Sequence, residues 1–464
     1  MKAKNYFFTQ LAITVAMCVF YTPSIKAQLT KFQKWQQPSY FTGFTMSVWD
    51  NNDMREVNQQ DFDSLKAIGA TLVAIQTQGS LDVESPYAPN IYWAEYPDTT
   101  FHIDRLDTMV SFARNAGLMY VIVVRDGPGR MDVSEDTGST IWTNPAEQQL
   151  YGKMLKDMAQ RYLPDTLFVG MALTVEPNPL GELWEPPIAV LDSALLANGI
   201  DLNALYTLWI DSVRTVDTEL PLVVGGVHAS HPEYFSLVSK QADDNIVYTT
   251  HLYNPANFSH EAMPYSVTYP DNYWSVRLDD IEYFDKTFMK DSLYKPVRDF
   301  QLTYNVPILV GEFGIRLPQN GGELYLNDIA EIACESGWHY AIWGFNNGPE
   351  FNYKDMDSIY GTNYWNTVKG LMNCGATGFE ETTIDNNVSV YPNPSDDNVY
   401  IEIQQAMLLQ KCVISIYNIH GQLMLQEPLQ QTKTEINIAN FSKGVYVVKV
   451  GNSENTIVKK LIKK

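Results

Sequence analysis

The chain has 464 residues, of which 45% are hydrophobic, enough for a large core and for more than one domain. It carries 54 acidic and 32 basic residues, a formal net charge of −22 at pH 7. This excess of negative charge argues against nucleic acid and anionic membrane surfaces as partners.

Residues 1–27 have the features of a secretory signal peptide. Lys2 and Lys4 give a basic start, "FFTQLAITVAMCVF" an apolar centre, and "IKA" a small-residue cleavage site. The apolar stretch is too short and interrupted for a good membrane span, and no later stretch is long enough. Cys18 would suggest a lipoprotein anchor, but the preceding "TVAM" is a poor lipobox. We therefore expect an exported protein with no transmembrane segment in the mature chain.

The exported chain would keep Cys334, Cys374 and Cys412. Three is an odd number, and the spacings match no zinc pattern. We therefore expect no disulfide framework and interpret all three as small buried apolar residues.

From residue 40 onward, eight β-rich runs alternate with amphipathic helical stretches. The runs are "FTGFTMSVW", "TLVAIQTQG", "LMYVIVVRD", "LFVGMALTVEP", "PLVVGGVHA", "NIVYTTHLYNP", "VPILVGEFG" and "HYAIWGFNN". Helical spacing is found in "DFDSLKAIGA", "IDRLDTMVSFARNAGL" and "PAEQQLYGKMLKDMAQRYL", the last with Pro145 at its start. Strands that alternate with helices indicate parallel strands joined by crossovers.

Eight such units predict an α/β fold, a (β/α)8 TIM barrel over residues 28–375. The alternative is an open doubly wound sheet. That fold usually has a glycine-rich phosphate turn after its first strand, and "SVWDNND" is not one.

Residues 376–387 are polar and are predicted to be a linker. Residues 388–464 contain short alternating runs, "VYIEI", "CVISIYNIHG", "EINIAN" and "GVYVVKV", with no helical pattern, and end in the basic tail "KKLIKK". This pattern predicts a small all-β sandwich domain.

Glu176 ends the fourth predicted strand, and Glu312 ends the seventh. Catalytic residues of a barrel come from the carboxyl ends of its strands, so these two side chains would meet at the mouth. Two carboxylates suit cleavage of a glycosidic bond: one protonates the leaving oxygen, and the other attacks the anomeric carbon. The pKa of the acid should then be raised by the second carboxylate and by burial. The alternative is that each is an ordinary strand-end carboxylate.

Other strand ends add polar and aromatic residues. His251 and Tyr253, two positions apart, lie on one side of the sixth strand, and the tyrosine can donate a hydrogen bond to a carboxylate. Trp343 on the eighth strand can form a platform for a sugar ring. Arg125 and Asp126 on the third strand can contact sugar hydroxyls or pair with each other. His251 can also be a structural histidine.

These motifs, in this order, resemble glycoside hydrolase family 5, in the clan of retaining (β/α)8 glycosidases, over about residues 40–375. They are the fourth-strand Glu-Pro, the sixth-strand His-x-Tyr, the seventh-strand Gly-Glu-Phe-Gly and the eighth-strand Trp. The resemblance implies a polysaccharide or oligosaccharide substrate and no metal or organic cofactor. It further implies an acid/base at Glu176, a nucleophile at Glu312, auxiliary His251 and Tyr253, and a platform at Trp343.

The sequence departs from that family at three positions. The family's Asn before the acid/base is Val175 here, and its second-strand Arg is absent, with Gln76 and Gln78 in that strand instead. The third-strand position that commonly holds His carries "RDGPGR". We hypothesise that Arg125 takes over from the absent arginine, in a divergent branch rather than a typical cellulase.

Three long loops carry aromatic side chains that would line a cleft for an extended ligand, although most of such rings pack within their own loops. These aromatic residues are Tyr87, Tyr92, Trp93, Tyr96, Trp184, Tyr265, Tyr273 and Trp274.

The C-terminal region has a second resemblance. "VSVYPNPSDDNVYIEI", "ISIYNIHGQLM", "FSKGVYVVKV" and the basic end resemble the type A sorting domain of the type IX secretion system. This resemblance implies export by the signal peptide and then passage through the outer membrane by the type IX machinery, to an extracellular or cell-surface location. The alternative is a generic carbohydrate-binding sandwich.

Together these observations predict a secreted glycoside hydrolase that cleaves β-glycosidic bonds by a retaining double displacement. The alternative, motivated by Val175, is a non-catalytic carbohydrate-binding barrel. An acyl hydrolase is disfavoured because the sequence contains no G-x-S-x-G nucleophile elbow.

Overall fold

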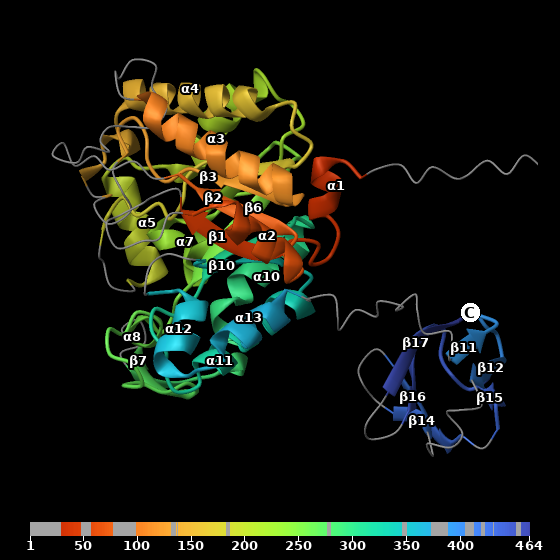
Figure 1. Ribbon diagram of the computed structural model, residues 1–464. Helices are drawn as coiled ribbons and strands as arrows, with labels where there is room; N and C mark the ends of the chain where they lie inside the picture. The colour runs from red at the N-terminus through yellow and green to blue at the C-terminus, as the bar shows by residue number, and fades with distance from the viewer. Residues whose placement is uncertain are drawn as a thin grey trace, which may run out of the picture.

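Figure 1 shows the computed structural model of the chain. It describes residues 29–47, 57–77, 99–130, 136, 138–181, 186–275, 280–345, 350–372, 388–403, 413–418, 423–429, 431–451 and 456–464. The predicted signal peptide, the predicted linker, the aromatic residues of the second-strand loop and Trp184 lie outside these residues, as do Gln78, Cys374 and Cys412.

Eight parallel strands close into a barrel in the order β1-β10-β9-β6-β5-β4-β3-β2. They are β1 (Thr42–Ser47), β2 (Leu72–Gln76), β3 (Met119–Val123), β4 (Phe168–Ala172), β5 (Leu222–Gly225), β6 (Ile246–Leu252), β9 (Ile308–Phe313) and β10 (His339–Trp343). Each lies inside one of the eight β-rich runs of the sequence. The predicted TIM barrel is therefore confirmed.

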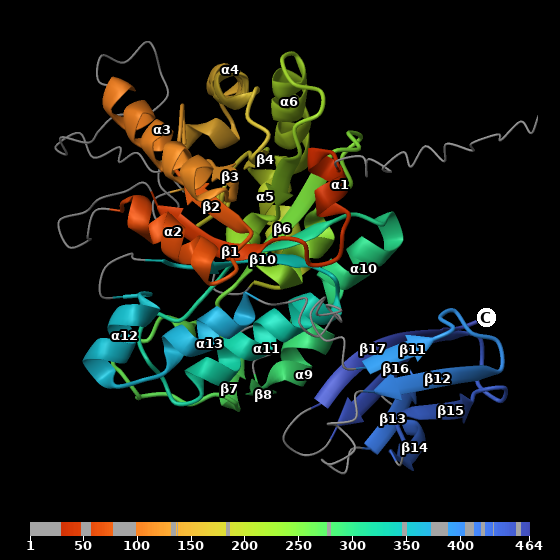
Figure 2. The same cartoon turned by 45° about the vertical axis from the view of Figure 1, so that its right-hand side comes forward.

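Helices surround the strands in Figures 1 and 2. The longer ones are α2 (Gln59–Ala67), α3 (Thr99–Ala116), α4 (Pro145–Tyr162), α5 (Ile188–Ala197), α6 (Leu202–Arg214), α10 (Lys295–Tyr304), α11 (Gly322–Glu335), α12 (Tyr353–Tyr360) and α13 (Tyr364–Leu371). The three predicted helical stretches correspond to α2, α3 and α4. Pro145 begins α4 behind the cap residue Asn144, as its missing N–H allows. Shorter helices are α1 (Lys31–Trp35), α7 (Val227–Ser230), α8 (Ala256–Ser259) and α9 (Lys286–Phe288).

The barrel is filled by apolar side chains rather than left open. Trp35, which ends α1, is buried inside it and donates its indole N–H to the Val169 carbonyl at 2.8 Å. Val175 belongs to the same interior cluster and is 3% exposed. Where the family that the sequence resembles carries an Asn, this chain therefore adds an apolar side chain to the barrel core.

The loop after β6 contains a hairpin that the sequence analysis treated as a long loop. It pairs β7 (Asp271–Ser275) with β8 (Asp280–Phe284) in antiparallel register. Side chains of a strand alternate between its two faces, and Tyr273 is accordingly buried whereas Trp274 is 58% exposed. Tyr265 is also largely exposed.

Cys334, on α11, is disulfide-bonded. The prediction that it is a free buried cysteine is therefore wrong, because an odd number of cysteines still permits one pair, and an oxidising compartment favours it.

Among the described residues no single helix is long and apolar enough to cross a membrane; only the sharply bent pair α5 and α6 meets that length and composition together.

The C-terminal region is all-β. One sheet has the order β11-β12-β15 and the other β14-β13-β16-β17. Their bounds are β11 (Val388–Tyr391), β12 (Asn398–Ile403), β13 (Val413–Asn418), β14 (Leu423–Pro428), β15 (Lys433–Asn437), β16 (Gly444–Gly451) and β17 (Thr456–Lys463). Apolar residues of both sheets form one core. Most of the predicted basic tail is part of β17, which pairs with β16 and buries Leu461.

Candidate active site

Glu312 is the penultimate residue of β9, and its side chain is buried. The glycines on either side of it leave room for neighbouring groups. A Cβ at Gly311 would lie 2.8 Å from Nε2 of His251, and one at Gly314 would lie 2.2 Å from the Trp343 carbonyl oxygen. The motif "VGEFG" thus keeps space for two of the predicted site residues beside the carboxylate.

Glu176 lies four residues beyond the end of β4, in a turn. Its φ of 45° is in the left-handed region, which few residues other than glycine adopt. The amide of the preceding Val175 donates to the Val124 carbonyl at 2.9 Å, so pairing with the third strand continues up to this turn. The turn aims the carboxylate toward the barrel mouth.

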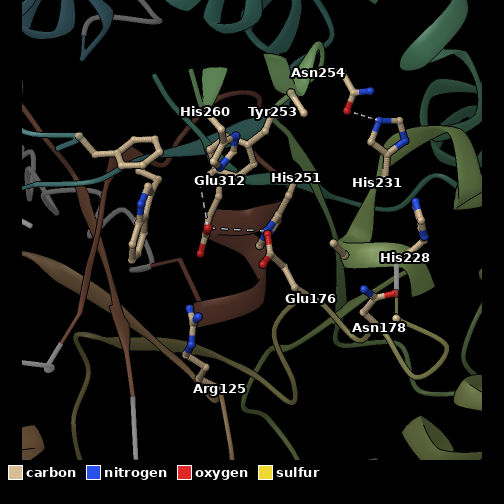
Figure 3. A pocket seen from close by; sticks show the side chains of 15 residues that line it. Arg125, Glu176, Asn178, His228, His231, His251, Tyr253, Asn254, His260 and Glu312 are labelled. Atoms are coloured by element: carbon tan, nitrogen blue, oxygen red, sulfur yellow. Dashed lines mark hydrogen bonds and ion pairs between the residues drawn. The ribbon is translucent and has the colours of Figure 1, made fainter. Parts of the chain in front are cut away.

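His251, on β6, connects the two carboxylates. Its Nδ1 lies 2.8 Å from Oε1 of Glu176 and 3.8 Å from Oε2 of Glu312. One polar atom from each of the three residues lies within 4.8 Å of the others, and Figure 3 shows both carboxylates turned toward the imidazole. Glu176 and Glu312, which are 136 residues apart in sequence, therefore belong to one site.

Neutral donors also fix the Glu312 carboxylate, one from β2 and one from the residue that follows β6. Tyr253 donates its hydroxyl to Oε2 at 3.1 Å, and the buried Gln76 donates its amide to Oε1 at 2.9 Å. Gln76 in turn accepts from Nη1 of Arg125 at 3.1 Å. Arginine has only donors, so it holds the Gln76 oxygen and turns the amide N–H group toward Glu312.

The contacts of Arg125 and Gln76 bear on the absent second-strand arginine. Arg125 bonds Gln76, which bonds Glu312, and the positive charge of Arg125 lowers the pKa of Glu312. The hypothesis that Arg125 takes over from the missing arginine stays a prediction, and the structure adds Gln76 between Arg125 and Glu312.

Burial raises the pKa of Glu312 to about 7, and the negative charge of Glu176 adds to the rise. The positive charges of His251 and Arg125 and the hydrogen bond from Tyr253 act in the opposite direction. Burial also raises the pKa of Tyr253 well above 10, so this hydroxyl remains a donor at neutral pH.

Glu176 shifts the other way. Burial alone would raise its pKa, but the hydrogen bond and charge of His251, with the charge of Arg125, bring the pKa below its usual value. Burial alone would lower the pKa of His251, yet the two carboxylates raise it. The expectation of a raised pKa for Glu176 is therefore wrong for this arrangement, because His251 donates to that carboxylate.

The site opens into a pocket of about 430 Å³. Trp343 lines this pocket, and Figure 3 shows Arg125 on one side of the carboxylates. On the other side, four polar side chains gather in Figure 3 from the loops after β4, β5 and β6. These polar residues are Asn178, His228, His231 and Asn254.

The structure thus brings six of the seven predicted site residues to one pocket. Asp126 is the exception: it is fully buried and is not among the lining residues, and its contact with a substrate stays a prediction. Neither Tyr273 nor Trp274 lines the pocket. The six residues that do are Glu176, Glu312, His251, Tyr253, Trp343 and Arg125.

Residues that the sequence analysis did not single out also line the pocket. His228 and the two residues after it have φ values of 54°, 55° and 58°, an uncommon run of left-handed conformation. His231 bonds the Asn254 side chain at 2.6 Å. Four histidines of the chain's seven line the pocket, a concentration that no local pattern in the sequence could reveal.

Glu176, His251 and Glu312 are also residue types that bind metal ions. In this structure their polar atoms bond one another and the donors Gln76 and Tyr253. A cation would have to displace those hydrogen bonds, and the arrangement fits proton transfer better than metal binding.

Comparison with known proteins identifies the family. The cellulase family, glycosyl hydrolase family 5, matches residues 32–349. The chain belongs to this family. It is a glycoside hydrolase, and its residues 389–464 match the secretion system C-terminal sorting domain.

Curated relatives of this glycoside hydrolase include Endoglucanase C of Acetivibrio thermocellus. It is 24% identical over 284 residues, which cover 54% of this chain and 73% of that protein. Cellodextrinase A of Ruminococcus flavefaciens is 22% identical over 214 residues, 46% of this chain and 57% of that protein.

Among solved structures, endoglucanase Cel5A from the hyperthermophilic Thermotoga maritima is similar in fold. It has a TM-score of 0.52 at 17% identity, covering 74% of this chain and 100% of that one. A structure of the Thermotoga enzyme in complex with mannotriose has a TM-score of 0.52 at 16% identity and covers 74% and 99%.

Proposed function

We propose that this glycoside hydrolase cleaves β-linked glucan chains and retains the configuration of the anomeric carbon. The observation that carries the proposal is the pairing of Glu176 and Glu312 across His251, with one oxygen of each within 4.8 Å. Retaining enzymes separate their carboxyl groups by about 5–5.5 Å, whereas inverting enzymes need about 6.5–9.5 Å to admit a water molecule. The short separation favours the retaining mechanism.

In the first step, an oxygen of Glu312 attacks the anomeric carbon while the bond to the leaving oxygen breaks. Glu176 gives its proton to that oxygen, and a glycosyl ester forms on Glu312. In the second step, Glu176 takes a proton from water, the water oxygen attacks the same carbon, and Glu312 is released. Tyr253 and Gln76 hold the Glu312 carboxylate throughout.

The chemistry needs Glu312 ionised and a proton on Glu176. The His251 hydrogen bond is the route by which the second condition can be met, since its Nδ1 lies 2.8 Å from Glu176. Moving that proton along the hydrogen bond gives neutral His251 and protonated Glu176 without a change in total charge. The three groups therefore titrate as one set, and the active form is one distribution of its protons.

The polar half of the pocket supports a sugar, rather than an apolar group, as the leaving group. Glu176 protonates the leaving oxygen, so the leaving group would lie on its side, near Asn178, His228 and His231. Amide and imidazole groups bind hydroxyls by hydrogen bonds. Trp343, which also lines the pocket, would stack on the ring that is attacked.

The choice of glucan rests on the relatives, which are named as endoglucanases and a cellodextrinase. Mannan is the second candidate, because a structural neighbour was solved with mannotriose. We expect the rate of hydrolysis of β-glucan to exceed the rates for mannan and xylan. Cleavage inside the chains would lower the viscosity of the substrate solution faster than it releases reducing ends.

The test is a screen on β-glucans, mannans, xylans and aryl β-glycosides, with proton NMR of the first-formed product. A β-anomer supports the retaining mechanism, and an α-anomer overturns it. Greater activity on mannan than on glucan would overturn the proposal that β-glucan is the preferred substrate.

We further propose that the C-terminal domain directs the enzyme through the type IX secretion machinery to the cell surface or medium, after export by the predicted signal peptide. Removing residues 388–464 should leave hydrolysis intact and prevent delivery in a host that has this machinery. Delivery of the truncated enzyme at the level of the full chain would contradict the proposal.

A further inference from the structure

The turn that carries Glu176 is bonded by a buried ion pair, Arg130 and Asp136, to which the sequence analysis gave no role. Arg130, in the loop after β3, is fully buried, with an exposed fraction of 0%. Its guanidinium faces Asp136, with Nε 3.4 Å from Oδ1 and Nη2 3.4 Å from Oδ2. Asp136 is 2% exposed.

The remaining donors of Arg130 are directed at the Glu176 turn. Nη1 donates to the Thr174 hydroxyl, and Nη2 donates to the Val175 carbonyl at 2.5 Å and lies 3.5 Å from the Glu176 carbonyl. Its guanidinium also lies over the Trp142 ring, 5.6 Å from the centroid. The arginine thus contacts three consecutive residues of the turn.

Asp136 holds the other end of the same turn. Its Oδ2 accepts the backbone N–H of Asn178 at 2.7 Å, and its Oδ1 accepts the Ser139 hydroxyl at 2.9 Å. The ion pair therefore bonds the chain on both sides of Glu176. A residue other than glycine keeps a left-handed conformation only where its surroundings hold it, and these bonds hold Glu176. A planar guanidinium suits this task because its donors lie in a fixed fork.

We propose that Arg130 and Asp136 are positioning residues for Glu176, holding the turn at residues 174–178 so that its carboxyl group reaches the leaving oxygen. The inference rests on the proposed acid/base role of Glu176. Neither residue lines the pocket, so the pair would act through the backbone that it binds. Its effect should appear only in reactions that need a proton from Glu176.

The test compares Arg130→Lys with Arg214→Lys. Arg214 is a matched control, because it also pairs with one aspartate, Asp243, and donates to two backbone carbonyls, of Asp217 and Leu220. It does not line the pocket. Both variants lose the guanidinium fork and keep the charge, so both should lower the melting temperature.

The readout is kcat/KM on aryl β-glycosides whose phenols span a range of acidity. Arg130→Lys should lose about ten- to a hundredfold on poor leaving groups, as expected for a misplaced catalytic group, and little on dinitrophenol. Arg214→Lys should leave the dependence on the leaving group unchanged. A folded Arg130→Lys enzyme whose dependence equals that of wild type, or that loses equally on all substrates, overturns the inference.

Two further variants keep the test decisive. If Arg130→Lys does not fold, Thr174→Val removes one acceptor of the guanidinium at nearly constant shape, and it should steepen the same dependence by a smaller factor; no change overturns the inference. Glu176→Ala separates the two proposals. If the wild-type enzyme hydrolyses β-glycosides and Glu176→Ala loses no more activity on poor leaving groups than on good ones, the acid/base role of Glu176 is wrong. The positioning role of Arg130 and Asp136 is then wrong as well.

Discussion

Glu312 and Glu176 meet at one histidine, but the chain holds them in different ways. Glu312 belongs to a regular strand, β9, and the side chains of Gln76 on β2 and of Tyr253, just after β6, bond its carboxylate directly. Glu176 lies in a left-handed turn beyond β4, and Arg130 bonds that turn mainly through its backbone.

This difference shows which part of the fold positions each of the two carboxylates. Closure of the barrel brings the strand ends together, and this fixes Glu312. Glu176 also requires a local turn that barrel closure does not specify. We therefore expect damage around Glu312 to affect all substrates and damage around Glu176 to affect those with poor leaving groups.

Replacing the strand-borne carboxylate should have the largest effect. Glu312→Ala should reduce kcat by on the order of a thousandfold or more for every leaving group, because no covalent intermediate can form. Azide added to this variant should enter the vacated side and give a glycosyl azide of inverted configuration. Retained configuration in that product would mean that the roles of the two carboxylates are exchanged.

Replacing the turn-borne carboxylate should divide the substrates. Glu176→Ala should lose about a hundred- to ten-thousandfold on oligosaccharides, the usual contribution of a general acid. On an activated aryl glycoside the first step should survive, the glycosyl enzyme should accumulate, and azide should restore turnover with retained configuration. An enzyme without azide rescue would not have Glu176 as its acid/base.

Removing the hydrogen bond from Gln76 to Glu312 should give a smaller and uniform loss. A hydrogen bond to a charged group contributes about 1.5–3 kcal/mol, so Gln76→Ala should lower kcat/KM by roughly ten- to a hundredfold for good and poor leaving groups alike. Gln241→Ala, at a buried glutamine outside the pocket, is the control for folding. A loss confined to poor leaving groups would place the action of Gln76 on Glu176 instead.

The shared histidine should change the pH profile more than the rate. Glu312 must be ionised to attack, and its pKa is about 7, so kcat/KM should rise with pH through that region. The charge of His251 lowers this pKa; therefore His251→Asn should move the acidic limb to higher pH. His260→Asn should shift it less, because burial lowers the pKa of His260 and keeps it neutral. An unmoved limb in His251→Asn would contradict the electrostatic coupling.

The sequence by itself determined the architecture and the main chemical groups. Eight β-rich runs between amphipathic helices specify the barrel, because period and burial are local properties of the chain. The position of a glutamate at a strand end also predicts that it lies at the mouth, so Glu176, Glu312, His251 and Trp343 could be found without coordinates.

Only the tertiary structure decided how these groups are held and charged. The Gln76–Glu312 bond joins residues 236 apart in sequence, and the contacts of Arg130 with the Glu176 turn join residues 44 to 46 apart. The order of the two carboxylate pKa values depends on which one His251 faces, a matter of a 2.8 Å against a 3.8 Å contact. Local periodicity carries no information about such distances, because barrel closure and loop packing set them together.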